Sequence, residues 1–227
     1  MKSKSKRYKN GIEALDVSVA YPLSDAVKLL KSFPAAKFDE TVEIAMKLSI
    51  DPKKAEQAVR GAFSTPHGFG KTIRVIAFVD EANVEKAKKA GAIEAGGNDL
   101  ADKIKNEQWF DFDVAIAEPK MMKVVGLLGR VLGPKGLMPS PKAGTVVPDP
   151  IKAIEEFASG KQEYRNDAGS NIHYKIGKLS FENIKLEENI KAFVNQIVSV
   201  RPASVKGNYI SKVTISSTMG PGIKIQL

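Results

Sequence analysis

The pattern of hydrophobic and polar positions divides the chain into a central segment, residues 68–159, and two flanks that differ from it. The central segment contains continuous apolar runs over 72–79 and 112–117, which are typical of strands buried on both faces of a parallel sheet. Helical patterns and one short strand at 92–95 are interleaved with these runs, the helices being expected over 84–90, over 99–106 with Asn98 as cap, and over 119–128. Strands alternating with helices predict a small α/β domain, Rossmann-like, with a parallel sheet in three layers.

The flanks instead show strands that alternate strictly between apolar and polar positions. Residues 41–48 and 210–218 follow this alternation, which indicates that one face is buried and the other is exposed. Apolar positions over 190–198 recur at helical spacing, and Arg201-Pro202 ends that helix. Asp51-Pro52 is expected to start another helix, and runs 162–165 and 172–176 are expected to pair as a hairpin.

These two patterns predict a discontinuous α+β terminal domain, residues 1–67 and 160–227, with the α/β domain of residues 68–159 inserted into it. Domain termini often lie close together, and for this reason insertions are tolerated. The chain passes between the domains near His67-Gly68 and Ser159-Gly160. We expect these crossings to form a two-stranded hinge that contains glycine.

The distribution of charge singles out the terminal domain. The formal net charge is +9 with a pI near 9.5, which indicates either an anionic partner, most commonly nucleic acid, or a charge surplus for solubility. Lys plus Arg number 12 against 8 Asp plus Glu in residues 1–67, 10 against 5 in residues 160–227, and 13 against 13 in residues 68–159. The net charges are therefore +4, +5 and 0, and the terminal domain is interpreted as the polyanion-binding one.

Candidate catalytic chemistry is sparse. The chain has no cysteine and only two histidines, His67 and His173, which excludes disulfides, thiolate metal sites and histidine clusters and suits a reducing cytoplasm. The sequence 68–72 resembles a phosphate loop but lacks its first glycine and is followed by a β-run instead of a helix. Asp111 and Asp113 share a strand face with no histidine or nucleophile paired to them. We expect no enzyme, cofactor or metal, a nucleotide-dependent enzyme being the alternative.

The segment 129–147 is dense in glycine and proline, and we expect an irregular, ordered loop. Arg130, Lys135 and Lys142 make it basic, so contact with phosphate is one interpretation. Packing over the sheet through its apolar residues is the other, and the sequence does not separate the two.

The polar strand faces of the terminal domain supply the candidate binding residues. In the last strand, Lys212 and Thr218 lie on the polar face, and Thr218 leads into a glycine-containing turn. Gly220 lets a backbone approach a ligand closely, and Met219 offers an adaptable apolar contact to a sugar or a base. Near the start of the chain, Thr41 and Glu43 share an exposed face, where a carboxylate could accept a hydrogen bond from a 2′-OH or a guanine amino group.

Three segments, taken in order, resemble the large-subunit ribosomal protein L-one family in its bacterial form. They are Lys37-Phe-Asp-Glu-Thr-Val-Glu43, then Gly129-Arg-Val-Leu-Gly-Pro-Lys-Gly-Leu-Met-Pro139 with Pro141-Lys-Ala-Gly-Thr145, and finally Ser217-Thr-Met-Gly-Pro221. The resemblance implies a structural protein that binds a folded three-way region of large-subunit rRNA. It further implies a mobile stalk involved in release of deacylated tRNA from the exit site, and repression of the protein's own operon mRNA.

The resemblance also implies which residues contact RNA. They are Lys37, Phe38, Thr41 and Glu43 at one end, Ser217, Thr218, Met219 and Gly220 at the other, and His173, to which we add Lys212. We expect recognition of RNA shape, in which Lys and Arg neutralise phosphates while the polar edges read 2′-OH and base groups.

Overall fold

The computed structural model describes residues 5–13, 15–16 and 18–226. The chain divides into two compact units, one made of residues up to Gly70 together with those from Tyr164 onward, the other of Lys71–Glu163. The boundaries predicted from the sequence, 67/68 and 159/160, lie a few residues before those of the units. No helix in the described part of the chain is long and apolar enough to cross a membrane.

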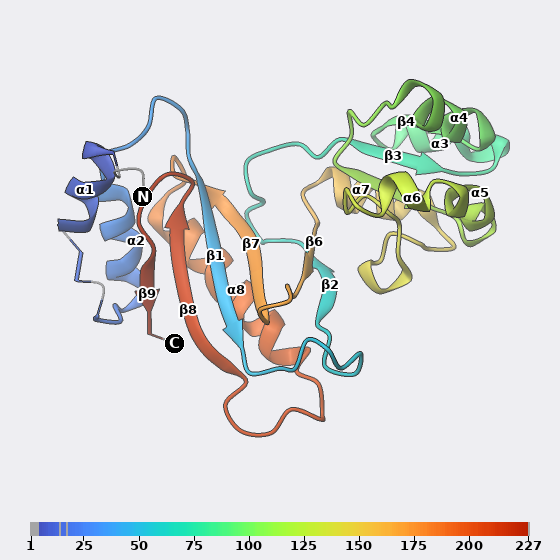
Figure 1. Ribbon diagram of the computed structural model, residues 1–227. Coiled ribbons are helices and arrows are strands. Elements are labelled where there is room, and N and C mark those ends of the chain that lie inside the picture. The colour runs from blue at the N-terminus through green and yellow to red at the C-terminus, as the bar shows by residue number, and fades with distance from the viewer. Residues whose placement is uncertain (1–4, 14, 17, 227) are drawn as a thin grey trace. The chain divides into compact units, whose positions relative to one another are not determined.

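The first unit contains a four-stranded antiparallel sheet in the order β7-β1-β8-β9 (Figure 1). Its strands are β1 (Thr41–Leu48), β7 (Asn171–Lys178), β8 (Ile210–Ser217) and β9 (Ile223–Ile225). Strand β1, from the first flank, lies between β7 and β8 from the second flank, so the sheet forms only when both flanks come together. The predicted strands at 41–48 and 210–218 are confirmed.

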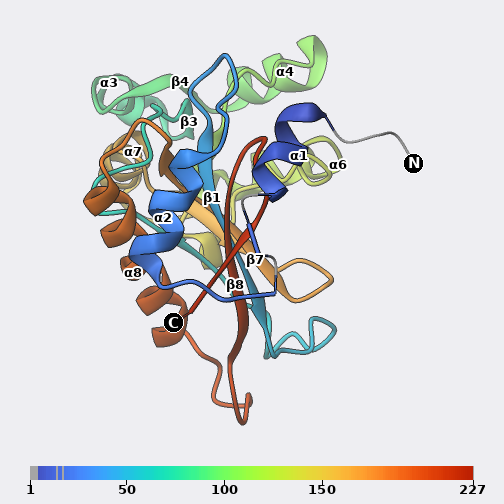
Figure 2. The ribbon, with the colours of Figure 1, turned by 90° about the vertical axis from the view of Figure 1, so that its left-hand side faces the viewer.

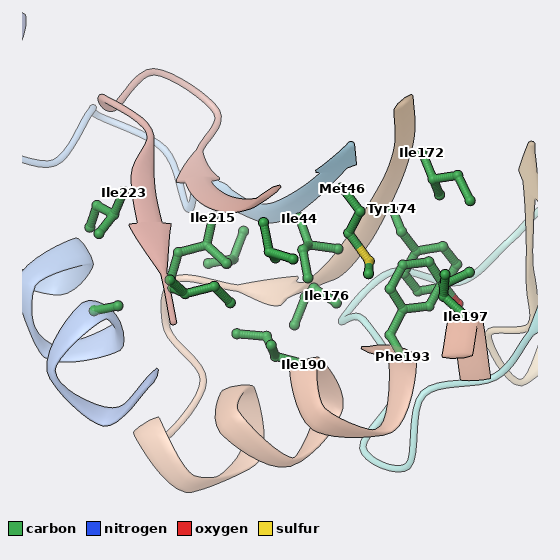
Figure 3. Packing of buried hydrophobic residues seen from close by; sticks show 14 of the residues in the cluster. Ile44, Met46, Ile172, Tyr174, Ile176, Ile190, Phe193, Ile197, Ile215 and Ile223 are labelled. Carbon is green, nitrogen blue, oxygen red and sulfur yellow. The ribbon is translucent and has the colours of Figure 1, made fainter. Parts of the chain in front are cut away.

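Helices α2 (Leu23–Ser32) and α8 (Asn183–Ser199) pack against the apolar face of this sheet (Figure 2). Every second residue of β1 is buried, and Ile190, Phe193 and Ile197 of α8 point at the strands from the other side (Figure 3). A buried Ile or Phe contributes about 1.5–3 kcal/mol, so this layer is the main source of the unit's stability. Helix α1 (Lys6–Glu13) is polar and buries only Gly11 among its described residues.

The predicted hairpin of 162–165 with 172–176 is wrong. Strand β6 (Gln162–Arg165) pairs with β2 (Arg60–Phe63), whereas β7 pairs with β1. The chain does turn back at the predicted place, but the backbone pairing there is an isolated bridge between Asn166 and Ile172. Two hydrogen bonds between Asn166 and Val59, at 3.0 and 2.9 Å, draw the end of β6 toward the β2 segment instead.

The helix predicted from Asp51-Pro52 is also wrong, because residues 52–57 form turns and a bend. Asp51 does accept a hydrogen bond from the Lys53 amide at 3.1 Å, much as a helix cap would. However, the Gln57 side chain accepts one from the Asp51 amide at 2.7 Å, which folds the segment back on itself. This side-chain contact within the turn competes with the helix.

The second unit is built on a three-stranded parallel sheet in the order β4-β3-β5, which confirms the predicted parallel α/β arrangement. The strands are β3 (Val75–Phe78), β4 (Ala92–Gly96) and β5 (Val114–Ala117). The helices are α3 (Glu81–Lys89), α4 (Asn98–Glu107), α5 (Met122–Leu127), α6 (Gly129–Leu132) and α7 (Pro150–Ala158). Two 3-10 turns, η1 (Pro119–Met121) and η2 (Pro141–Ala143), complete it.

Two local predictions in this unit need correction. Asn98 is the first residue of α4, and Gly97 takes the cap position instead. The segment 129–147 is not irregular throughout, since it contains α6 and η2. Leu132 is fully buried and Leu137 packs on the same cluster, so apolar contacts impose local order despite the glycines and prolines. This favours the packing interpretation of the segment.

Candidate nucleic-acid interface

The face of the four-stranded sheet opposite the core is polar, and most of its charged side chains are basic. Strand register places Glu43 between Lys175 and Ser216, and it places Lys47 between Asn171 and Lys212. In the row between these two, His173 and Thr214 flank Ala45. The sequence predicted this face because alternation assigns these positions to the side away from the core. We call it the open face.

The open face carries several positive side chains and one central carboxylate. Lys47, Lys175 and Lys212 are exposed, whereas Glu43 is partly buried between its neighbours. His173 is exposed too, and its Nε2 lies 3.8 Å from the Asp167 carboxylate. The pKa of Asp167 is held below its usual range, mainly by hydrogen bonds from the Asn171 amide and side chain. Asp167 therefore stays ionised beside His173.

At one end of this sheet, β1 begins where β8 ends, which brings the first and third sequence motifs together (Figure 1). The hydroxyl of Thr218 accepts a hydrogen bond from the Thr41 amide at 2.9 Å and donates one to the Thr41 carbonyl at 3.2 Å. Close to this pair, Phe38 and Met219 remain 54% and 51% exposed, although both side chains are large and apolar. We call residues 37–41 with 217–220 the motif edge.

Glu40 is the residue at the motif edge that sequence reasoning missed. The residue is only 2% exposed. Its carboxylate accepts hydrogen bonds from the Ala36 amide at 2.8 Å, from the Met219 amide at 2.9 Å and from Ser217 Oγ at 2.7 Å. The carboxylate also forms an ion pair with Arg7 Nη1 at 3.2 Å. Burial alone would raise the pKa of Glu40. The hydrogen bonds and the Arg7 charge outweigh burial and hold this pKa below its usual range.

Two predicted contact residues occupy supporting positions. Ser217 is buried on the core side of β8, and its hydroxyl is already donated to Glu40. Gly220 sits so close to Ser217 that a Cβ at position 220 would lie 2.5 Å from Ser217 Oγ. The glycine is therefore needed to admit the Ser217–Glu40 hydrogen bond.

The four predicted hinge residues fall into different units. His67 and Gly68 belong to the first, where the Asn189 side chain of α8 bonds the His67 amide at 3.1 Å and the Gly68 carbonyl at 3.0 Å. Ser159 and Gly160 belong to the second, at the end of α7, and Gly160 has a positive φ of 116°. Asn189 is another residue that sequence reasoning missed, because a lone asparagine in an amphipathic helix carries no distinguishing signal.

Comparison of the sequence with known proteins identifies the family of the chain. Residues 30–221 match the model of the Ribosomal protein L1p/L10e family. The chain is 53% identical over 227 residues to the large ribosomal subunit protein uL1 of Fervidobacterium nodosum, covering 100% of this chain and 97% of that one. It is 50% identical to the uL1 proteins of Thermosipho africanus, over 99% of this chain and 97% of that one, and of Mycoplasma capricolum subsp. capricolum, over 98% of each.

These matches define the chain as a ribosomal protein, and it belongs to the L1p/L10e family. The resemblance inferred from the three motifs is thereby confirmed. Membership in a family of structural ribosomal proteins also confirms the prediction that the chain is not an enzyme.

Proposed function

We propose that the chain is a structural protein of the large ribosomal subunit and that its first unit binds large-subunit rRNA. The observation that carries this proposal is the convergence of the first and third motifs at the motif edge, beside the open face. Relatives that are 50–53% identical over nearly the whole chain are named as large-subunit proteins, which supports the same assignment.

The mechanism follows from the chemistry of the two surfaces. Lys47, Lys175 and Lys212 on the open face neutralise phosphates and release counterions, which supplies the salt-dependent part of the affinity. At the motif edge, Phe38 and Met219 offer apolar surfaces for unstacked bases or sugars. Glu43, further along β1, accepts hydrogen bonds from 2′-OH or base amino groups in competition with its neighbouring lysines.

The finer features implied by the family resemblance form part of the same proposal. The RNA target is a folded three-way region of rRNA, and the bound protein forms a mobile stalk that takes part in release of deacylated tRNA from the exit site. An element in the protein's own operon mRNA mimics the rRNA site, and binding of the protein to this element represses translation of the operon. The inserted domain swings on a two-stranded hinge near residues 67–68 and 159–160 while the terminal domain stays attached to RNA.

The test is a titration of the purified full chain against the rRNA stalk fragment over a range of salt concentrations, with scrambled RNA of equal length and composition as control. We expect tight binding of the stalk fragment that duplex DNA does not displace. The affinity should fall with salt concentration with a slope that corresponds to several phosphate contacts. Equal affinity for both RNAs would reduce the protein to a general polyanion binder. Heat of ATP or GTP binding in calorimetry would instead favour the nucleotide-dependent alternative.

A further inference from the structure

We propose that Glu40 is a positioning residue for the RNA interface and that Arg7 is its partner. Its carboxylate holds the loop of Lys37 and Phe38 and the turn of Met219 in the one arrangement that recognises RNA, without contacting RNA itself. The proposal rests on the RNA-binding function proposed above. It adds a buried side chain that determines how the exposed ones are placed.

The environment of Glu40 is built for an ionised carboxylate. Four donors converge on it, two backbone amides, one hydroxyl and one guanidinium. A carboxylate offers about four lone-pair sites and no donor, so it can satisfy all four groups at once. Glutamine has nearly the same shape but only one acceptor oxygen. Its NH₂ group is itself a hydrogen-bond donor and could not accept hydrogen bonds from the donors around it. The site therefore discriminates strongly between two nearly isosteric side chains.

The hydrogen bonds of Glu40 act on backbone next to the exposed apolar residues. The amide of Met219 is one of the bonded groups, and the amide of Ala36 lies two residues before Phe38. Phe38 and Met219 are mostly outside the core, so the direction of each depends on the backbone that carries it. A backbone fixed before binding loses less conformational entropy when RNA binds, which increases affinity for the RNA of matching shape.

Arg7 makes helix α1 part of this arrangement. Its Nη1 pairs with Glu40 at 3.2 Å and its Nη2 donates to the Met219 carbonyl at 3.4 Å, so it contacts both the carboxylate and the turn. A buried carboxylate is costly without a counter-charge, and Arg7 supplies one. Arg7 precedes the residues 30–221 matched by the family model, so the motifs themselves do not include it.

The test uses Glu40→Gln, Glu40→Asp and Arg7→Met in the full chain. Each is titrated with the stalk RNA fragment and with scrambled RNA over the same salt series. Glu155→Gln, at an exposed carboxylate of α7, is the matched control for Glu40→Gln because both remove one negative charge. Thermal unfolding identifies temperatures at which every variant is folded. Amide NMR shifts of Ala36 and Met219 report whether the carboxylate still accepts their hydrogen bonds.

We expect Glu40→Gln to bind stalk RNA about 10- to 100-fold more weakly, the size expected for unpaired buried donors. Affinity for scrambled RNA and the salt slope should stay unchanged, since no phosphate contact is lost. Glu40→Asp should lose less affinity for stalk RNA than Glu40→Gln does. Arg7→Met should lower this affinity less when it is added to Glu40→Gln than when it is introduced alone. A folded Glu40→Gln variant with undiminished discrimination between the two RNAs would overturn the inference. Wild-type protein that does not discriminate would overturn the proposed function instead.

Discussion

Replacing Gly220 with alanine should break a hydrogen bond between two other residues. The added Cβ would lie 2.5 Å from Ser217 Oγ, closer than a methyl group and a hydroxyl can approach. Ser217 must then rotate away from Glu40, whose Oε2 it contacts at 2.7 Å in a buried site. A hydrogen bond to a charged group contributes about 1.5–3 kcal/mol, and this is the loss of unfolding free energy that we expect.

A double-mutant cycle isolates this mechanism. Ser217→Ala removes the same hydrogen bond and also the atom that clashes, so Gly220→Ala should add little in that background. The double variant should therefore be about as stable as either single one, a coupling of about 1.5–3 kcal/mol. Gly126→Ala is the control, because a Cβ there has no neighbour within 4 Å among the described residues.

Denaturant unfolding can follow the two units separately in the intact chain. All five tyrosines belong to the first unit, and the single tryptophan, Trp109, belongs to the second. Gly220→Ala should shift the tyrosine signal and leave the tryptophan signal in place, whereas the control Gly126→Ala should leave the tyrosine signal in place. Additive losses in the cycle, or a full-sized loss from Gly220→Ala in the Ser217→Ala background, would refute the proposed clash.

Three further predictions concern the same unit. Thr218→Val removes both hydrogen bonds to the Thr41 backbone and should weaken stalk RNA binding by about 1–3 kcal/mol; equal affinity in a folded variant, measured by titration, would contradict this. Asn189→Ala leaves backbone groups of His67, Gly68 and Ile176 without their partner and should lower the tyrosine-detected unfolding free energy by roughly 2–4 kcal/mol, whereas an unchanged midpoint would exclude the role. Because folding lowers the pKa of Glu40, its contribution is present above the ordinary carboxyl pKa and is lost as pH falls from that value through the lowered pKa of the folded state. Acid unfolding should therefore be less steep in Glu40→Gln, and an identical profile would argue against it.

The sequence predicted the strands of the sheet and its two faces because alternation is a local property of the chain. It could not predict which strands pair, since pairing depends on contacts between distant segments. The wrongly predicted hairpin of 162–165 with 172–176 shows this. Strand β6 pairs with β2 instead, next to hydrogen bonds between Asn166 and Val59, which are 107 positions apart. The helix expected at Asp51 failed for a related reason, since Gln57 supplied a competing partner.

The exposed residues of the candidate site were predictable from the motifs, whereas the role of the buried Glu40 was missed. One signal could have found it. Ser217 occupies a core-facing position of β8, and Glu40, directly before β1, continues the buried side of the alternation in β1; a hydroxyl and a carboxylate are out of place there. Two polar residues on the buried sides of adjacent strands are expected to bond each other. That inference also requires knowing that β1 and β8 are neighbours, and only the fold supplies this.

The proposed binding of RNA by the first unit can be tested through the reactivity of lysines in the full chain. Lysines are labelled with an amine-reactive reagent in the presence and absence of the stalk RNA fragment and quantified by mass spectrometry. Lys37 and Lys212 should be protected by RNA, while Lys120 and Lys123, which are exposed on the second unit, should stay reactive. Protection of Lys120 and Lys123, with Lys37 and Lys212 unaffected, would contradict RNA binding by the first unit.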